Sequence, residues 1–176
     1  MNIHTLDRVV TTSLDSPVGP LLVGATDDGI CLLEFAEPAR QQVQLAALRR
    51  QFGDAVEPGR HDHTDRLAEE LAEYFAGARR EFTVPIVFPG TPFQQRVWGQ
   101  LLAIPYGETR SYEDVACALG MPAASRAVGR ANGQNRVAIV IPCHRVVNKG
   151  GGLGGYGGEL WRKRFLLDLE RRGPGA

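Results

Sequence analysis

The chain has 176 residues with 20 basic and 20 acidic side chains, and its formal net charge of zero by itself argues against a nucleic-acid partner. Its length suits one large domain or two small ones, each with a hydrophobic core. The charge is uneven, because residues 1–90 carry 8 basic and 14 acidic side chains and residues 91–176 carry 12 and 6. A basic second half suits a polyanion, and chance segregation of solvated charge is the alternative.

The first half of the chain, residues 1–90, is predicted to be an α/β domain. We expect a β-meander over residues 9–36, because short apolar runs alternate there with turns marked by Pro, Asp and Gly. A helix is predicted over residues 39–52, with apolar positions at Val43, Ala46, Ala47 and Phe52. After it we predict a loop over 54–63, a helix over 65–76 and a strand or extended linker over 84–88.

The second half, residues 91–176, is predicted to be a mostly helical domain. Thr91–Gln94 forms a capping box with Pro at the first helical position, and an apolar stripe follows it. Further elements are expected in this order: short helices from Ser111 and from Ala123, a strand over 137–141, a glycine loop over 150–158 and a helix near 159–171. The fold class is therefore α+β, a small β-meander with helices followed by a helical domain.

Residues 111–132 have the form of a helix-turn-helix. The packed face of its second helix is predicted from small apolar residues at helical spacing, namely Ala124, Ala127, Val128 and Ala131. The opposite face carries Arg126, Gly129 and Arg130, which could meet a phosphate backbone or enter a groove. A short amphipathic helix with two solvated arginines is the alternative.

A thiol and an imidazole are adjacent at Cys143 and His144. A neighbouring base and nearby positive charge favour the thiolate, which is the nucleophilic form. Pro142 fixes the backbone before the thiol, so we expect Cys143 at the rigid end of a strand. The alternative is a small apolar cysteine that caps a buried strand.

The glycine loop matches the pattern G-x-G-x-x-G from Gly152 to Gly157. A dinucleotide site also needs a second strand and an acidic residue about 20 positions further on, where this chain has Arg172. We therefore expect no nucleotide and no other cofactor. The loop is predicted to form a wall over a pocket, in which Tyr156 either stacks on a flat base or packs on the core.

Cysteine use and hydropathy bear on the compartment. Cys31, Cys117 and Cys143 form no CxxC pair, which favours a reducing environment. The first residues do not resemble a signal peptide, and no apolar run approaches the roughly 18 residues of a membrane span. We expect a cytoplasmic protein that has no membrane partner.

Residues 91–170 resemble the O6-alkylguanine-DNA alkyltransferases, also called methylated-DNA–protein-cysteine methyltransferases. The matching segments are Phe93–Trp98, Ile104–Gly107, Thr109–Tyr112, Arg126–Gly129, Ala131–Asn132, Ile141–Val146, Gly154–Gly158 and Lys163–Arg164. They run in order over nearly half of the chain. The first half matches more weakly, mainly through Ser16–Leu21, and the resemblance implies that it has a ribonuclease-H-like fold.

The resemblance implies catalytic roles for five residues. Cys143 would accept the alkyl group, and His144 would act as its base through a water molecule. Glu170 would orient the imidazole, and Asn135 would hydrogen-bond near the thiol. Tyr112 would help to rotate the nucleotide and would face the guanine. Taken alone, Glu170 suits a solvated ion pair, Asn135 a turn and Tyr112 simple packing.

The resemblance also implies which residues contact DNA and the flipped base. The DNA-binding set is Tyr112, Arg126, Ala127, Gly129 and Arg130, with Arg126 filling the gap left in the base stack. The substrate pocket would comprise Pro142, Val146, Tyr156 and Gly157.

The chain departs from the family pattern at three places. Gly157 stands where some relatives carry Ser, so only its backbone N–H could donate to the base. Arg136 stands where Pro is common. Some relatives bind a structural metal, but the spacing of His4, Cys31, His61 and His63 fits no standard site, so we expect no metal and assign both His61 and His63 to a loop.

The function implied is direct-reversal DNA repair on double-stranded DNA that contains alkylated guanine. The protein would flip O6-alkylguanine and transfer the alkyl group to Cys143 once, because a thioether has no good leaving group; O4-alkylthymine stays open as a second substrate. A monomer is expected, and cooperative binding along DNA is left open. A lesion binder without transfer and a helix-turn-helix transcription factor are the two rival interpretations.

Overall fold

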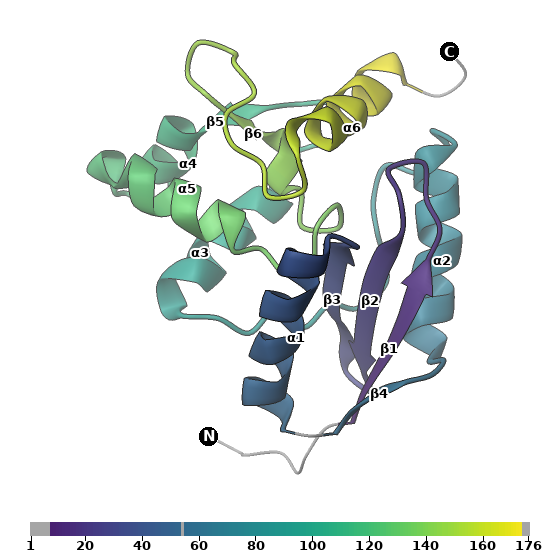
Figure 1. The fold of residues 1–176 in the computed structure, drawn as a ribbon. Coiled ribbons are helices and arrows are strands. Elements are labelled where there is room, and N and C mark those ends of the chain that lie inside the picture. The colour runs from purple at the N-terminus through teal and green to yellow at the C-terminus, as the bar shows by residue number, and fades with distance from the viewer. Residues whose placement is uncertain (1–7, 54, 174–176) are drawn as a thin grey trace.

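The computed structural model describes residues 8–53 and 55–173 (Figure 1). In its first half, β1 (Val9–Leu14), β2 (Leu21–Thr26) and β3 (Gly29–Phe35) pair antiparallel, which confirms the predicted meander. A fourth strand, β4 (Val56–Pro58), pairs parallel with β1 and completes the sheet order β3-β2-β1-β4. The prediction of a loop over 54–63 was therefore wrong for β4, because three residues are too few to show a period.

The sheet lies between two helices, α1 (Pro38–Phe52) and α2 (Asp62–Phe75), as Figure 1 shows. The predicted inner face of α1 was partly wrong. Val43 is 65% exposed, whereas Gln44 is buried. The polar residue faces inward because its Nε2 donates to Oε2 of the buried Glu34 at 3.1 Å.

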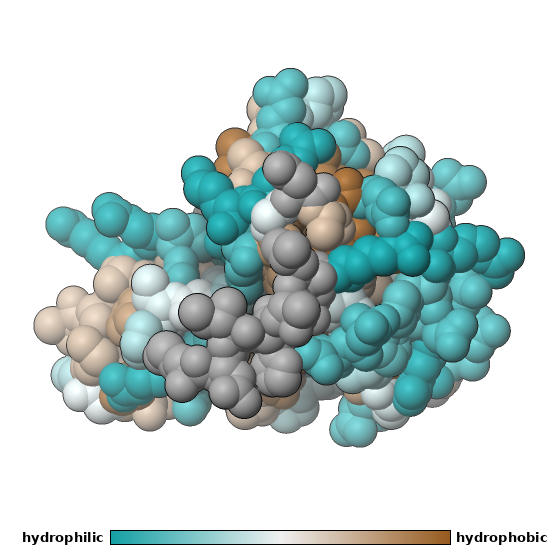
Figure 2. Space-filling view, turned by 90° about the horizontal axis from the view of Figure 1, so that it is seen from below, coloured by the Kyte–Doolittle hydropathy of each residue, from teal (hydrophilic) through white to brown (hydrophobic). Residues whose placement is uncertain are grey.

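Helix α2 begins three residues earlier than predicted, because its first turn is capped. The ring nitrogen Nδ1 of His61 accepts from the backbone N–H of His63 at 3.1 Å, and Thr64 Oγ1 accepts from the N–H of His61. The prediction that His61 and His63 belong to a loop was thus wrong for His63, which lies in the helix. Seen from below, hydrophilic residues cover most of the side on which α2 lies (Figure 2).

The second half is mostly helical, as predicted. Its elements are α3 (Pro92–Leu102), β5 (Arg110–Ser111), α4 (Tyr112–Ala118), the 3₁₀ turn η1 (Pro122–Ala124), α5 (Ser125–Gly133), the 3₁₀ turn η2 (Cys143–Arg145), β6 (Val146–Val147) and α6 (Leu160–Arg172). The capping box of α3 is confirmed, since Thr91 Oγ1 accepts from Gln94 N and Gln94 Oε1 accepts from Thr91 N. Helices α4 and α5 form the helix-turn-helix.

The apolar run over residues 137–141 is a buried turn and not the predicted strand. The N–H of Ile141 donates to the carbonyl of Val137 at 2.9 Å, and Ile139 has a φ of 70°. Only Val137 pairs with a strand, through a bridge to Leu33 of β3. A short apolar run indicates that a segment is buried but does not distinguish a strand from a turn, which is why the strand prediction was wrong.

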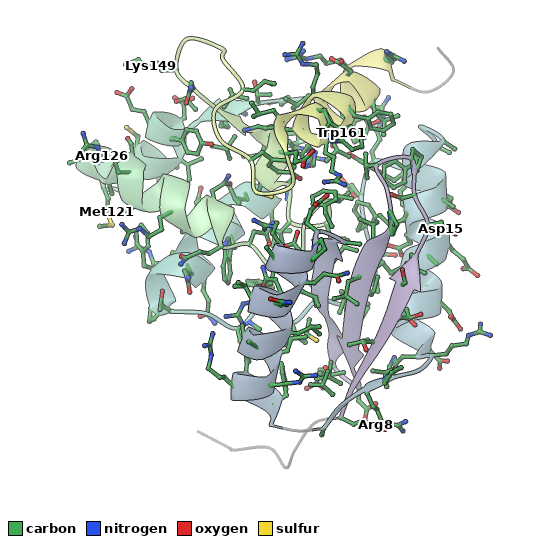
Figure 3. The ribbon with its side chains drawn as sticks, viewed as in Figure 1. Arg8, Asp15, Met121, Arg126, Lys149 and Trp161 are labelled. Carbon is green, nitrogen blue, oxygen red and sulfur yellow. The ribbon has the colours of Figure 1, made fainter. Side chains whose placement is uncertain are left out.

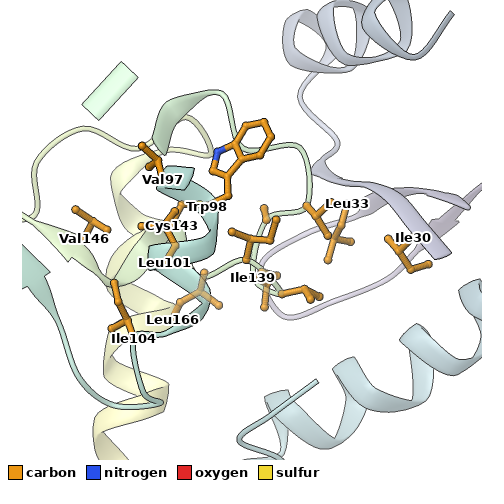
Figure 4. Packing of buried hydrophobic residues seen from close by; sticks show 14 of the residues in the cluster. Ile30, Leu33, Val97, Trp98, Leu101, Ile104, Ile139, Cys143, Val146 and Leu166 are labelled. Atoms are coloured by element: carbon orange, nitrogen blue, oxygen red, sulfur yellow. The ribbon is translucent and has the colours of Figure 1, made fainter. Parts of the chain in front are cut away.

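One cluster of buried hydrophobic residues joins the two halves of the chain. Figure 4 shows Ile30 and Leu33 of β3 on one side of Ile139, and Trp98 and Cys143 on the other side. The segment around residues 137–141 therefore packs between the sheet and the helical half. Among residues 8–53 and 55–173, no helix is both long and apolar enough to cross a membrane.

Candidate functional site

Cys143 is the first residue of η2 and follows Pro142 directly, at the start of a 3₁₀ turn and not at a strand end. Only 5% of the residue is exposed, and it lines a pocket of about 390 Å³. Burial raises the pKa of its thiol, and the charge of Glu34 acts in the same direction. A hydrogen bond from Asn135 and the positive charge of Lys163 oppose that rise.

His144, the residue after Cys143, is fully buried, and its ring nitrogen Nε2 lies 2.7 Å from Oε1 of Glu170. Because an ionised carboxylate only accepts hydrogen bonds, Nε2 carries the proton and Nδ1 carries the lone pair. Nδ1 has no hydrogen-bond partner among the described residues. Burial lowers the pKa of His144 in spite of Glu170, so the imidazole is neutral and its Nδ1 is available as a base.

Glu170, on α6, is the most heavily bonded carboxylate of the site. Besides His144, it accepts from Tyr74 Oη at 2.7 Å, from Arg145 Nε at 2.9 Å and from the N–H of Gly107 at 3.2 Å. Burial alone would raise its pKa, but the hydrogen bonds from His144 and Arg145, together with the charge of Arg145, outweigh burial and lower it. Glu170 therefore stays ionised and fixes the imidazole.

Tyr74 and Arg145 are parts of this network that sequence reasoning missed. Arg145 is adjacent to His144 in the chain, so its position was a signal that could have been used. Tyr74 lies 96 residues before Glu170 on the apolar face of α2, where nothing local distinguishes it from a core residue.

Asn135 anchors the turn that precedes the thiol. Its Nδ2 donates to the carbonyl of Ile141 at 2.8 Å, and its Oδ1 accepts from the N–H of Val137 at 2.9 Å. Asn132, near the end of α5, donates to the carbonyl of Cys143 at 3.3 Å. Asn132 thereby ties the helix-turn-helix to the backbone of the reactive residue, and Asn135 holds the turn before it.

The pocket over Cys143 has walls from three parts of the chain. Tyr112 of α4 and Gly129 of α5 form one wall, and Tyr156 and Gly157 of the glycine loop form another. Pro142 and Val146, predicted as pocket residues, are buried and do not belong to the lining. The carbonyl of Val146 instead accepts from Lys163 Nζ of α6 at 2.6 Å.

A third wall comes from the first half of the chain, which the sequence analysis did not predict. Glu34, Phe35 and Arg40 all line the pocket. Arg40 Nη2 lies 2.7 Å from Oε2 of the buried Glu34, and the Phe35 ring packs edge-on to Tyr156 at 5.8 Å between centroids.

The outer face of α5 carries Arg126, Ala127 and Arg130, which are exposed around a shallow hollow. Figure 3 shows Arg126 on the side of the helix-turn-helix that faces away from the sheet. Ala127 therefore does not belong to the packed face as predicted, which Val128 and Ala131 form. Tyr112 lies against Gly129, where an added Cβ would be 3.6 Å from the ring.

Within the described residues, no group of three or more His, Cys, Asp or Glu side chains could hold a metal ion. Instead, His61 and His63 direct their Nε2 atoms to Asp27, at 3.2 Å from its Oδ1 and 3.1 Å from its carbonyl oxygen.

The fold and the site are those of a class, the DNA alkyl transferases, whose members are named for transfer to a cysteine of the protein itself. Two family models match the chain: the ribonuclease-like domain of 6-O-methylguanine DNA methyltransferase over residues 9–88, and its DNA binding domain over residues 92–172. The chain belongs to the 6-O-methylguanine DNA methyltransferase family and is a DNA-repair methyltransferase.

Relatives with this name are similar over almost their whole length. The methylated-DNA–protein-cysteine methyltransferase of Mycobacterium tuberculosis is 45% identical over 163 residues, which cover 90% of each chain. The constitutive enzyme of Bacillus subtilis is 42% identical over 91% of this chain and 94% of its own.

Solved structures agree with the α+β fold. A crystal structure of Mycobacterium tuberculosis OGT in complex with DNA superimposes with a TM-score of 0.81 at 43% identity, covering 95% of this chain and 96% of that one. The O6-methylguanine-DNA methyltransferase of Pyrococcus kodakaraensis gives a TM-score of 0.69 at 25% identity, covering 92% of this chain and 98% of its own.

Proposed function

We propose that the protein binds alkylated duplex DNA as a monomer, flips O6-alkylguanine into the pocket over Cys143 and transfers the alkyl group to that sulfur in a single turnover. One observation carries the proposal. The buried thiol lines a pocket that opens beside the helix-turn-helix, and the next residue of the chain is a neutral imidazole fixed by a carboxylate. A base must leave the stack to reach such a pocket, at a cost of a few kcal/mol.

The proton of the thiol is proposed to pass through a water molecule to Nδ1 of His144. That nitrogen is buried and lacks a protein partner among the described residues, whereas Nε2 is held by Glu170. The sulfur then attacks the alkyl carbon, an S–C bond forms and the C–O6 bond breaks. Its electron pair leaves with guanine, which takes up a proton, so that thiol and alkylguanine become thioether and guanine.

The departing guanine needs hydrogen-bond donors, since negative charge develops on it. The hydroxyl of Tyr112 and the N–H of Gly157 are the groups proposed for this role, because both residues line the pocket. Tyr156 is proposed to cover the flat face of the base. Arg126, which is exposed on α5, is proposed to occupy the gap left in the stack, where its charge also meets phosphate.

The test is the intact mass of the protein after mixing with a duplex that contains O6-methylguanine. We expect one added methyl group, located on the peptide with Cys143, and none in Cys143→Ser. Cys117→Ser is the matched control, because Cys117 is an exposed thiol outside the pocket and its loss should leave transfer unchanged.

The rival interpretations give different outcomes. Tight lesion binding without a mass gain indicates a lesion binder, and equal binding to damaged and undamaged duplex indicates a transcription factor. Repeating the assay with O4-methylthymine determines whether it is a second substrate. Arg126→Ala should slow repair in duplex more than reaction with free O6-benzylguanine, and equal losses would remove its proposed role in the stack.

A further inference from the structure

Several arginines near the reactive pocket have no carboxylate within 4.0 Å among the described residues. Four of these, Arg50, Arg126, Arg130 and Arg136, border two adjoining hollows of the surface. Arg126 and Arg130 belong to α5, within the family's DNA-binding half. Arg50 lies on α1, in the half of the chain that carries excess negative charge. The DNA-binding role of the second half therefore does not explain why Arg50 borders the same surface.

The second hollow is a groove of about 420 Å³ between α1 and the end of α5. Arg40, Arg50 and Arg136 line it, and no acidic side chain among the described residues does. Arg136 is half-buried and donates to Oε1 of Gln51 at 3.2 Å. Burial, and then the charge of Arg50, lower its pKa, and both guanidinium-bearing residues line the groove.

The groove is continuous with the surface that faces DNA. It shares Gln94 and Gln134 with the hollow under Arg126 and Arg130, and it shares Arg40 and Gly133 with the rim of the Cys143 pocket. In Figure 1, α1 descends from the neighbourhood of the end of α5. A chain of anionic groups that follows α5 can therefore enter the groove beside α1.

We propose that a DNA strand continues from α5 into this groove, where its phosphates contact Arg136 and Arg50. The first half of the protein is then a second DNA-binding surface and not only a support. The proposed ligand is a polyanion, because the positive charges of Arg50 and Arg136 repel each other and no carboxylate neutralises them. Successive phosphates of a DNA strand would neutralise both charges. Arg136 supplies one cation of the pair. This inference rests on the proposed function.

The experiment measures the affinity of the full chain for an unmodified duplex over a range of salt concentrations. Each phosphate contact contributes about 0.9 to the slope of log K against log salt. Arg50→Gln/Arg136→Gln should therefore reduce the slope by about 1.8. Arg50→Gln alone should reduce the slope by about 0.9. Because this variant changes an exposed side chain, it can be measured even if the double variant folds poorly.

Arg49→Gln/Arg80→Gln is the matched control, because it removes the same charge from exposed arginines that do not line the groove. We expect its slope to equal that of the wild type. An unchanged slope in the groove variants, or an equal loss in the control, would overturn the inference.

Two parallel measurements separate this inference from the proposed function. Methyl transfer by the wild type, together with an unchanged slope in the groove variants, contradicts only the groove contact. No transfer by the wild type contradicts the proposed function. The groove variants should react with free O6-benzylguanine at the wild-type rate, since neither arginine lines the Cys143 pocket.

Discussion

The phenol of Tyr74 and the carboxylate of Glu170 are joined by a 2.7 Å hydrogen bond between residues 96 positions apart. Tyr74 belongs to the sheet-bearing half and Glu170 to the last helix, so the group that holds the imidazole of His144 is itself held by the other half of the chain.

We expect Tyr74→Phe to lower the free energy of unfolding by about 1–3 kcal/mol, because a buried ionised carboxylate loses one of its donors. The rate of transfer from O6-benzylguanine should also fall, since His144 is held less firmly. Urea unfolding and single-turnover kinetics measure the two effects. Tyr106→Phe is the control: its hydroxyl is buried without a partner in the described chain, so its removal should cost little. Equal losses in both variants would contradict the role of the bond.

The stability of the protein should fall as the pH drops below about 6.5. The pKa of His144 is lowered in the folded state, chiefly by burial, so the unfolded chain binds the proton first. The stabilising contribution is present above the unfolded pKa and is lost below it, by at most about 1.4 kcal/mol per pH unit. The lowered pKa of Glu170 acts in the same direction at more acidic pH.

Urea unfolding at pH 7, 6 and 5 measures this dependence. His144→Gln should show a shallower decline between pH 7 and 5 than the wild type. A wild-type stability that is constant or rises over that interval would contradict the neutral, buried imidazole.

Gly157→Ala should destabilise the protein by about 1–3 kcal/mol through overpacking. An added Cβ would overlap the guanidinium of Arg40, which pairs with the buried Glu34 at 2.7 Å, so the pair would have to separate. Thermal or urea unfolding provides the measurement. Gly155→Ala serves as the control in the same loop, because no atom lies within 4 Å of its added Cβ.

Asn135→Ala should cost about 2 kcal/mol of stability, since two backbone groups of the 137–141 turn lose their partner. Transfer from O6-benzylguanine at neutral pH should also slow, because the hydrogen bond from Asn135 lowers the pKa of Cys143. Gln134→Ala, at the exposed neighbouring position, should change neither quantity. A normal rate in Asn135→Ala would leave Asn135 a structural role only.

Local signals predicted local structure well. The capping residues Thr91 and Ser111 specify where α3 and α4 begin, because each side chain bonds to a backbone group three residues on. The adjacency of Cys143 and His144 likewise needed no tertiary information. The same holds for the meander, whose turns are marked by proline and glycine.

Contacts between distant segments could not be predicted in the same way. Strand β4 has three residues and β5 and β6 have two each, so their partners across the fold and not their own sequence make them strands. Glu34 and Arg40 have no pattern that points to a pocket on the other half. Glu170 itself was found only through the resemblance, because a glutamate among arginines is usually solvated.

Ile139 is a branched residue at a φ of 70°, a backbone conformation that costs of order 1–3 kcal/mol. Leu33 holds the backbone around Ile139. Its N–H donates to the carbonyl oxygen of Arg136 at 2.8 Å, and its carbonyl accepts from the N–H of Ala138 at 2.9 Å. A fragment from residue 91 onward keeps the nucleophile and the helix-turn-helix but lacks Leu33 and Tyr74. Such a truncated chain has the nucleophile but lacks the contacts that hold the backbone and the carboxylate around it. Because each half depends on the other for these contacts, the intact molecule should unfold in one cooperative step.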